Sequence, residues 1–223
     1  MQVTERIYLT PTPVRIWHWL NAFGILTLCL TGAEIRFPEV VQLLGDYKAA
    51  VRVHNTAGVV VTLSFGLWFL YYAVVARKLL KLYVPKGRDL KGMVKQAIFY
   101  GYHYFRGGPN PHVTTPEDKF NPLQKMAYLA IMFVCTPLVI VTGVLLMNVA
   151  PLREWVKAVG GLSLLISAHW MLACVFCAFL FVHIYLATLG HTPFAHFKPM
   201  WTGWEEHDTA HGDTHGDAGK KAA

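Results

Sequence analysis

The chain has 223 residues, of which 54% are hydrophobic and only 15% are charged. This composition excludes an ordinary soluble domain and indicates an integral membrane protein. The formal net charge is +7, which would suit either a polyanion-binding surface or the basic loops of a membrane protein.

Four apolar stretches are each long enough to cross about 30 Å of hydrocarbon. They cover residues 16–33, 56–76, 126–150 and 162–189, and they contain no Asp, Glu, Lys or Arg. Because lipid offers no partner for free backbone groups, stretches of this length must span as helices. We expect the first to be a retained helix and not a cleaved signal, since Glu34 and Arg36 follow it without a small-residue cleavage site. The sequence therefore predicts an all-α, four-helix transmembrane bundle within residues 1–205.

The basic residues predict the orientation of this bundle. Fifteen Lys and Arg residues flank the side that holds both termini and the connection between the second and third spans, against five on the other side. The positive-inside rule then places both termini in the cytoplasm. The positive-inside rule explains the positive net charge, so no nucleic-acid partner is expected. The expected surroundings of the chain are membrane lipids.

Two segments lie outside the predicted spans. Residues 89–105 alternate basic and apolar side chains, which favours an interfacial helix in the connection between the second and third spans. Residues 206–223 form a polar tail with His207, His211 and His215 at four-residue intervals. That interval would align three imidazoles on a helix, but the glycines of the tail oppose helix formation and favour disorder.

Four histidines, His18, His54, His169 and His183, lie in or at the mouths of the spans. His169 and His183 are fourteen residues apart on one helix, so they share a face and differ in depth by roughly 21 Å. His18 enters the first span from the cytoplasmic side and His54 enters the second from the outer side. Depth therefore pairs His18 with His183 and His54 with His169.

Two level pairs of imidazoles on facing helices predict axial ligands for two haem b groups. Iron with both axial positions filled is suited to electron transfer. Cys174 and Cys177 have the spacing of the Cys-x-x-Cys-His motif that attaches haem covalently, but Ala178 stands where that motif has His. A c-type haem is therefore not expected. The alternative from the residues alone is a haem-free anchor, or a small transporter that uses the histidines as proton or metal sites.

Several further residues near the spans have two interpretations. Arg15 and Arg52 lie close to His18 and His54 and could bind haem propionates, or they could serve only as topology signals. The aromatic residues near span ends, namely Trp17, Trp19, Tyr71, Tyr72 and Trp170, are typical of interfacial belts. Glycines within the spans, namely Gly24, Gly32, Gly58, Gly66 and Gly143, could let a macrocycle or a neighbouring helix approach closely.

An ordered set of motifs over residues 5–205 resembles the cytochrome b subunits of nickel-iron hydrogenases, formate dehydrogenases and thiosulfate reductases. These motifs are Pro13-Val14-Arg15-Ile16-Trp17-His18-Trp19-Leu20-Asn21, Thr31-Gly32, His54-x-x-x-Gly58, Asn121-Pro122-Leu123-Gln124-Lys125, the His169 and His183 pair, and Met200-Trp201-Thr202-Gly203. The resemblance implies a dihaem, quinone-reactive subunit in a bacterial or archaeal cell inner membrane.

The formate dehydrogenase branch of this family implies a quinone near His183 and Asn121. Asn121 could bind a quinone carbonyl, or it could cap the third helix ahead of Pro122. This chain has Leu123 where that branch has Gly, so its quinone pocket is expected to differ from that of the formate dehydrogenase branch at this position. The expected partners are an iron-sulfur or cytochrome c subunit at the outer face and a catalytic subunit, since the chain shows no substrate chemistry of its own.

Overall fold

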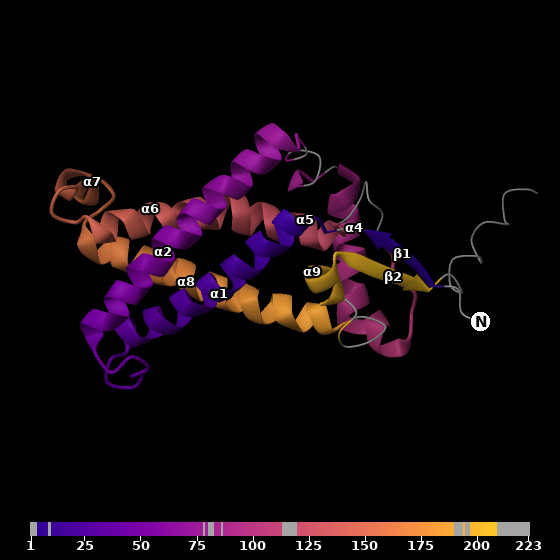
Figure 1. Cartoon of the computed structure of the whole chain (residues 1–223), viewed down its shortest axis with the longest axis horizontal. Coiled ribbons are helices and arrows are strands. Elements are labelled where there is room, and N and C mark those ends of the chain that lie inside the picture. Colours follow the sequence, from indigo (N-terminus) through magenta and orange to yellow (C-terminus); the bar gives the residue numbers. More distant parts are fainter. Residues whose placement is uncertain are drawn as a thin grey trace, which may run out of the picture.

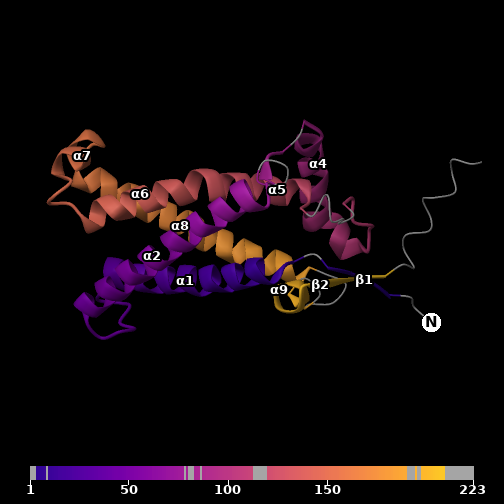
Figure 2. The same ribbon diagram turned by 45° about the horizontal axis from the view of Figure 1, so that its top comes forward.

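The computed structural model describes residues 4–8, 10–77, 79, 83–85, 87–112, 120–189, 194 and 197–208. Four helical stretches within this part are long and apolar enough to cross a membrane, which confirms the predicted four-helix bundle (Figures 1 and 2). The first two are α1 (Thr12–Arg36) and α2 (Tyr47–Leu70), the latter continued by the π-helical turn η1 (Tyr71–Val75). The third comprises α5 (Pro122–Ala130), η4 (Ile131–Cys135) and α6 (Thr136–Met147), and the fourth is α8 (Leu162–Thr188).

Shorter elements lie at the two ends of the bundle (Figure 1). One end holds α7 (Arg153–Ala158) and the connection between α1 and α2. The other end holds α4 (Gly87–Ile98), η2 (Phe99–His103), η3 (Tyr104–Arg106), α9 (Lys198–Thr202) and the strands β1 (Thr4–Tyr8) and β2 (Trp204–Asp208). Helical structure is thus confirmed across the segment predicted as an interfacial helix. The side of the membrane on which each end lies stays a prediction.

The helices contact one another in the order α1, α2, α6 and α8, and α8 returns to α1. Gly24 allows the approach of α1 to α2, because a Cβ atom there would lie 2.4 Å from Cγ2 of Val61. On the opposite side of α1, the sulfur atoms of Cys29 and Cys177 lie 3.2 Å apart and join α1 to α8. One helix, α1, therefore holds both of its neighbours by close contacts.

Helix α2 begins well before the apolar stretch predicted to span. Its N-terminus is fixed by Asp46, whose carboxylate accepts hydrogen bonds from the backbone N–H groups of Lys48 and Ala49, both at 3.2 Å. Hydropathy marks only the hydrocarbon-length part of a helix, whereas an Asp cap can start the helix several residues earlier. As a result His54 lies about two turns inside α2, not at its mouth.

The third span is interrupted in its middle by the π-helical turn η4. Pro137 follows this turn and has no N–H to donate to the carbonyl four residues earlier, so the α-helical hydrogen-bond pattern is incomplete there. The N–H of Thr136 reaches back to the carbonyl of Ile131, and its hydroxyl donates to the same carbonyl at 2.8 Å. The span therefore stays hydrogen-bonded across the bulge.

An aromatic cluster fills the bundle at the end that holds β1 and β2 (Figure 1). Its centre is Trp68, which is 4% exposed, and the ring of Trp17 stacks on it with centroids 5.5 Å apart. Tyr72 and Tyr83 are also buried against Trp68. Tyr72 is thus buried inside the cluster, which contradicts its interpretation as an interfacial-belt residue, whereas Trp17 packs against the cluster and is half-buried.

Strands β1 and β2 form a two-stranded antiparallel sheet that the sequence did not predict. Tyr8 pairs with Trp204 at one end and Thr4 pairs with Asp208 at the other. Strand β2 extends three residues into the segment expected to be a tail. His211 and His215 lie outside the described residues.

Candidate functional site: two pairs of facing histidines

The inner pair, His18 and His183, joins α1 to α8. The centroids of the two imidazole rings are 6.2 Å apart, and their planes are inclined by 53°. Both rings also contact aromatic side chains. Phe179, one turn before His183, stacks on its ring at 5.6 Å, and Trp19 meets the ring of His18 edge-on at 5.2 Å.

The outer pair, His54 and His169, joins α2 to α8. Its ring centroids are 6.3 Å apart and its planes are inclined by 73°. The structure therefore brings together the two pairs that depth predicts from the sequence. Helix α8 contributes one histidine to each pair, and the fourteen residues between them correspond to roughly 21 Å along the helix.

The ring separations fit one metal ion between the two imidazoles of each pair. A histidine nitrogen lies about 2 Å from a bound metal ion, and the centre of the ring lies about 1.1 Å behind that nitrogen because ring bonds are near 1.33 Å. Two imidazoles on opposite sides of one iron therefore have centres roughly 6.2 Å apart. The observed separations are 6.2 and 6.3 Å.

A threonine holds each histidine of the outer pair. Thr31 Oγ1 on α1 lies 3.0 Å from Nδ1 of His54, and Thr142 Oγ1 on α6 lies 2.9 Å from Nδ1 of His169. Both contacts cross from one helix of an antiparallel hairpin to the other. The imidazoles of the outer pair are thus held by hydrogen bonds as well as by packing.

A glycine follows each of these threonines and lies against the same imidazole. A Cβ atom at Gly32 would be 3.4 Å from Cε1 of His54, and one at Gly143 would be 3.4 Å from Cε1 of His169. Both glycines were expected from the sequence to allow close approach, whereas the contact of Thr142 with His169 was not predicted. The signal that could have found it is the repeated Thr-Gly dipeptide, once in the first span and once in the third.

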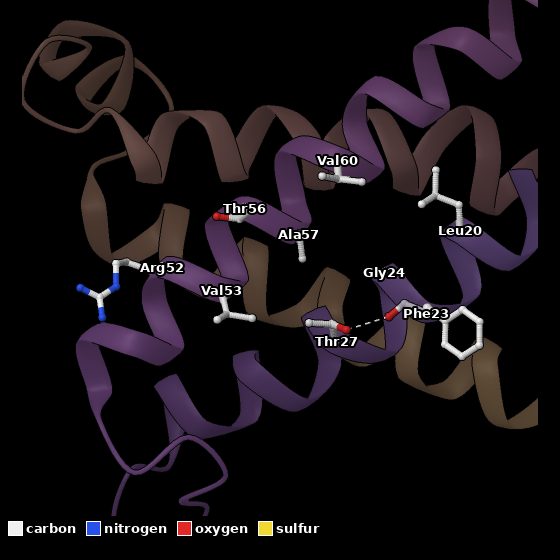
Figure 3. Close-up of a pocket in the computed structure, with 9 residues that line it drawn as sticks. All are labelled: Leu20, Phe23, Gly24, Thr27, Arg52, Val53, Thr56, Ala57 and Val60. Atoms are coloured by element: carbon white, nitrogen blue, oxygen red, sulfur yellow. Dashed lines mark hydrogen bonds between the residues drawn. The ribbon is translucent and has the colours of Figure 1, made fainter.

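The two arginines considered for haem propionates are placed differently. The guanidinium of Arg15 donates to the hydroxyl of Thr12 at 2.8 Å and to the backbone carbonyl of Trp201, which ties α1 to α9. Arg52 is exposed. It lies at one end of a shallow, mostly apolar groove of about 410 Å³ between α1 and α2 (Figure 3).

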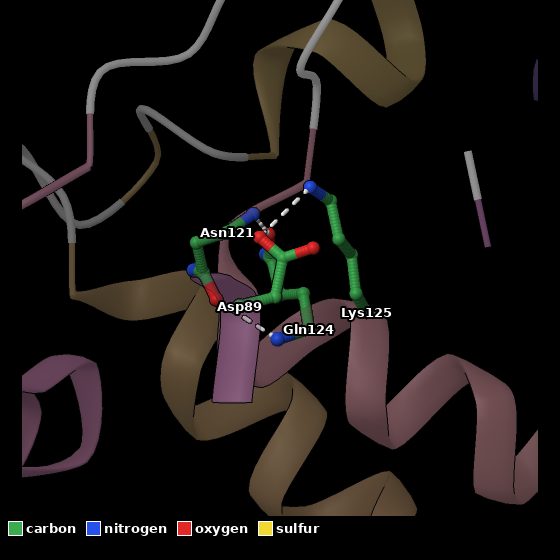
Figure 4. Close-up of polar contacts among 4 residues, drawn as sticks. All are labelled: Asp89, Asn121, Gln124 and Lys125. Carbon is green, nitrogen blue, oxygen red and sulfur yellow. Dashed lines mark hydrogen bonds and ion pairs between the residues drawn. The ribbon is translucent and has the colours of Figure 1, made fainter. Parts of the chain in front are cut away.

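Asn121 caps α5, as one of the two sequence interpretations expected. Its side-chain oxygen accepts from the backbone N–H of Gln124 at 2.8 Å, and the side chain of Gln124 accepts from the backbone N–H of Asn121 at 3.0 Å (Figure 4). Its amide nitrogen donates to the hydroxyl of Tyr100 at 3.2 Å. The carbonyl of the side chain is therefore occupied by the cap, and the amide N–H₂ group is the part that could also serve a ligand.

Asn121 belongs to a polar cluster between α4 and α5, which consists of Asp89, Gln96, Tyr100, Asn121 and Lys125. All of these residues except the half-buried Tyr100 are at most 5% exposed. Lys125 Nζ and Asp89 Oδ1 form an ion pair of 3.4 Å within it (Figure 4). Burial raises the pKa of the Tyr100 phenol, although hydrogen bonds with Gln96 and Asn121 act the other way. Tyr100 is therefore neutral at physiological pH and can act as a donor or an acceptor.

Comparison with known proteins gives one family and several relatives. The profile of the family described as prokaryotic cytochrome b561 matches residues 9–203. The putative cytochrome YdhU of Escherichia coli strain K12 is 32% identical over 210 residues, which cover 91% of this chain and 76% of that protein.

Two probable Ni/Fe-hydrogenase B-type cytochrome subunits are also similar over shorter stretches. The subunit from Rhizobium leguminosarum bv. viciae is 36% identical over 110 residues, or 44% of each chain. The subunit from Rhodobacter capsulatus is 33% identical over 78 residues, or 32% of this chain and 29% of that protein. No solved structure gives a significant match.

Proposed function

The chain belongs to the prokaryotic cytochrome b561 family, and on this premise we propose that it is a dihaem subunit that carries electrons across the membrane between a protein partner and the quinone pool. Family membership makes it a b-type cytochrome of a prokaryotic membrane, a multi-pass electron-transfer protein. The two haems, their ligands, the quinone and the partner are the proposal. The observation that carries it is the presence of two histidine pairs at two depths of one apolar bundle.

In this proposal the inner pair, His18 and His183, holds one haem b, and the outer pair, His54 and His169, holds the other. Bound haem supplies reversible one-electron chemistry at each site. The four imidazoles would hold the two haems, two for each, and the haems so held would serve electron transfer. The spacing of the rings within each pair supports this assignment. Arg15 and Arg52 are proposed to neutralise propionates, and Arg15 would combine that role with its hydrogen bonds to Thr12 on α1 and Trp201 on α9.

The quinone site is proposed at the end of the bundle that holds the polar cluster. Asn121 and Tyr100 offer neutral hydrogen-bonding groups there, at the edge of an apolar bundle. Because the carbonyl of Asn121 accepts the cap bond, a quinone carbonyl would have to accept from its amide N–H₂ group. The positive-inside rule makes this end cytoplasmic, so reduced quinone would take its protons from the cytoplasm.

The partner is proposed at the opposite end, where α7 and the connection between α1 and α2 lie. Hydrogenase cytochrome subunits among the relatives support a complex with a catalytic subunit. An iron-sulfur or cytochrome c subunit is the chemistry that would exchange single electrons with the outer pair. Flow in either direction, toward quinone or from quinol, is compatible with this arrangement.

The test is the haem content of the purified protein and of four variants. The pyridine hemochrome should give two haem b per chain for the wild type. His18→Ala or His183→Ala should remove one haem and quinol reactivity together, whereas His54→Ala or His169→Ala should remove the other haem. His103→Ala is the matched control, because His103 is exposed on η2. A colourless wild-type protein from native membranes would overturn the proposal in favour of a haem-free anchor or transporter.

A further inference from the structure

We propose that Thr31 and Thr142 are positioning residues that fix the tautomer and the ligand strength of His54 and His169 toward the outer haem. This inference rests on the proposed function, because it concerns two of the four proposed ligands. It adds residues on α1 and α6, so that all four spanning helices would take part in the outer site.

The direction of the Thr31 hydrogen bond follows from its second contact. Oγ1 of Thr31 lies 2.7 Å from the backbone carbonyl oxygen of Thr27, one turn earlier. Two oxygens at this distance share a proton, and a carbonyl has none to give, so the Thr31 hydroxyl donates to Thr27. Its single proton is then used. Across the 3.0 Å contact, Thr31 must accept, and Nδ1 of His54 must donate.

Thr142 repeats this arrangement on the other hairpin. Its Oγ1 lies 2.9 Å from the carbonyl oxygen of Leu138 and 3.1 Å from that of Val139. The hydroxyl proton is therefore committed to the carbonyls of α6. Across the 2.9 Å contact with Nδ1 of His169, Thr142 again accepts.

The two hydrogen bonds at Nδ1 of His54 and His169 have the same effect on the other ring nitrogen, Nε2. A neutral imidazole with its proton on Nδ1 has its lone pair on Nε2, which is the nitrogen left to bind a metal. An acceptor at Nδ1 also fixes the ring orientation and makes the imidazole a stronger electron donor. A stronger donor favours ferric over ferrous iron, so both threonines should lower the reduction potential of the outer haem.

The inner pair provides an internal reference for this effect. The described contacts of Thr31 and Thr142 to histidine are with the outer pair alone, and the rings of His18 and His183 contact Trp19 and Phe179. A change in either hydroxyl should therefore act on one haem and leave the other unchanged. General loosening of the bundle would affect both.

The experiment compares Thr31→Val, Thr142→Val and the double variant with the wild-type dihaem protein. Valine keeps the shape of threonine and removes the hydroxyl. The readouts are the midpoint potentials of both haems in a redox titration and the low-spin ferric EPR signal of each haem. Loss of a ligand-orienting contact typically changes metal binding by tenfold or more. A tenfold change between the two oxidation states is about 59 mV for one electron.

We expect each Val variant to raise the midpoint of the outer haem by about that amount and to shift its EPR signal, with the inner haem unchanged. Thr31→Ser and Thr142→Ser should restore wild-type values, since serine keeps the hydroxyl. Thr27→Val is the matched control, because the Thr27 hydroxyl makes the same type of bond to Phe23, at 2.8 Å, one turn away. If a Val variant loses the outer haem while its Ser counterpart keeps it, the inference is also supported.

Three outcomes would overturn the inference. They are an unchanged outer haem in both Val variants, an equal shift of both haems, or loss of the outer haem in the Ser variants as well. Each presumes a wild-type protein with two haems. A wild type without haem would instead overturn the proposed function, so the two failures are distinguishable.

Discussion

Lys125 on α5 and Asp89 on α4 form an ion pair of 3.4 Å in which both side chains are nearly inaccessible, at 6% and 4% exposure. It is one of the contacts that hold the amphipathic helix α4 against the third span. Close packing supports it, since a Cβ atom at Gly92 on α4 would lie 2.8 Å from Cγ of Pro122 on α5.

Replacing one member of this pair should destabilise the protein more than replacing both. Asp89→Asn removes the carboxylate that pairs with the buried ammonium of Lys125, a change that costs roughly 3–5 kcal/mol in buried pairs. The double variant Asp89→Leu with Lys125→Met should lose much less, because it buries no charge. Thermal unfolding in detergent measures both. Equal losses in the single and double variants would mean that charge plays no part in this contact.

Trp68 should be the most sensitive tryptophan of the described chain. It is 4% exposed and contacts the rings of Trp17, Phe65, Tyr72 and Tyr83. Trp68→Ala should cost roughly 3–5 kcal/mol through lost burial and the cavity left behind. Trp155→Ala is the control, since Trp155 is 68% exposed on α7 and its loss should be small. Similar unfolding midpoints for the two variants would contradict the assignment of the core.

Substitutions of Asn121 can separate its cap from its proposed contact with quinone. Asn121→Ala removes the cap and should cost about 1 kcal/mol. Asn121→Asp keeps an oxygen that can accept from Gln124 but removes the amide donor. If the amide binds quinone, the Asp variant should show a raised KM for a short-chain quinol that reduces the haem, beyond any loss of stability caused by the buried carboxylate and the lost bond to Tyr100. Unchanged quinol kinetics in a stable Asp variant would leave only the capping role.

The two thiols that join α1 and α8 should be the easiest pair to oxidise. With their sulfur atoms 3.2 Å apart, Cys29 and Cys177 need little movement to form a disulfide. Copper phenanthroline should produce one intramolecular link between these residues, detectable as a cross-linked peptide by mass spectrometry. Cys29→Ser should abolish it. A link from Cys177 to Cys174 or Cys135 instead would show that the packing of α1 on α8 is wrong.

Much of the fold and the histidine pairing could be predicted because both follow from one-dimensional patterns. Hydropathy and length located the four spans, and residue spacing along a helix of known rise gave the depth of His169 and His183. Depth alone then left only one pairing for His18 and His54. These arguments need no knowledge of which helix faces are in contact.

The contacts that the sequence could not predict depend on how each helix is rotated about its own axis. Thr142 contacts His169 because the face of α6 that carries Thr142 is turned toward α8. Hydropathy does not predict which face of a helix points inward when the helix is apolar on all sides. Tyr72 was expected at the membrane interface for the same reason, because composition at the end of a span does not distinguish a ring that faces inward from one that faces outward. The start of α2 was missed because a cap at Asp46 lies beyond the apolar stretch.

The bulge at η4 bears on that rotation. A π-helical turn inserts one extra residue into an α-helix, and each residue turns the helix by about 100°. Everything after Cys135 is therefore swung by about that angle relative to a straight continuation of α5. Removing a single residue from the bulge would leave the span almost as long as before, yet it would aim the Thr142 hydroxyl away from α8. The π-helical turn thus sets the rotation of α6 relative to α5, so that one span begins at the Asn121 cap and still presents Thr142 to His169.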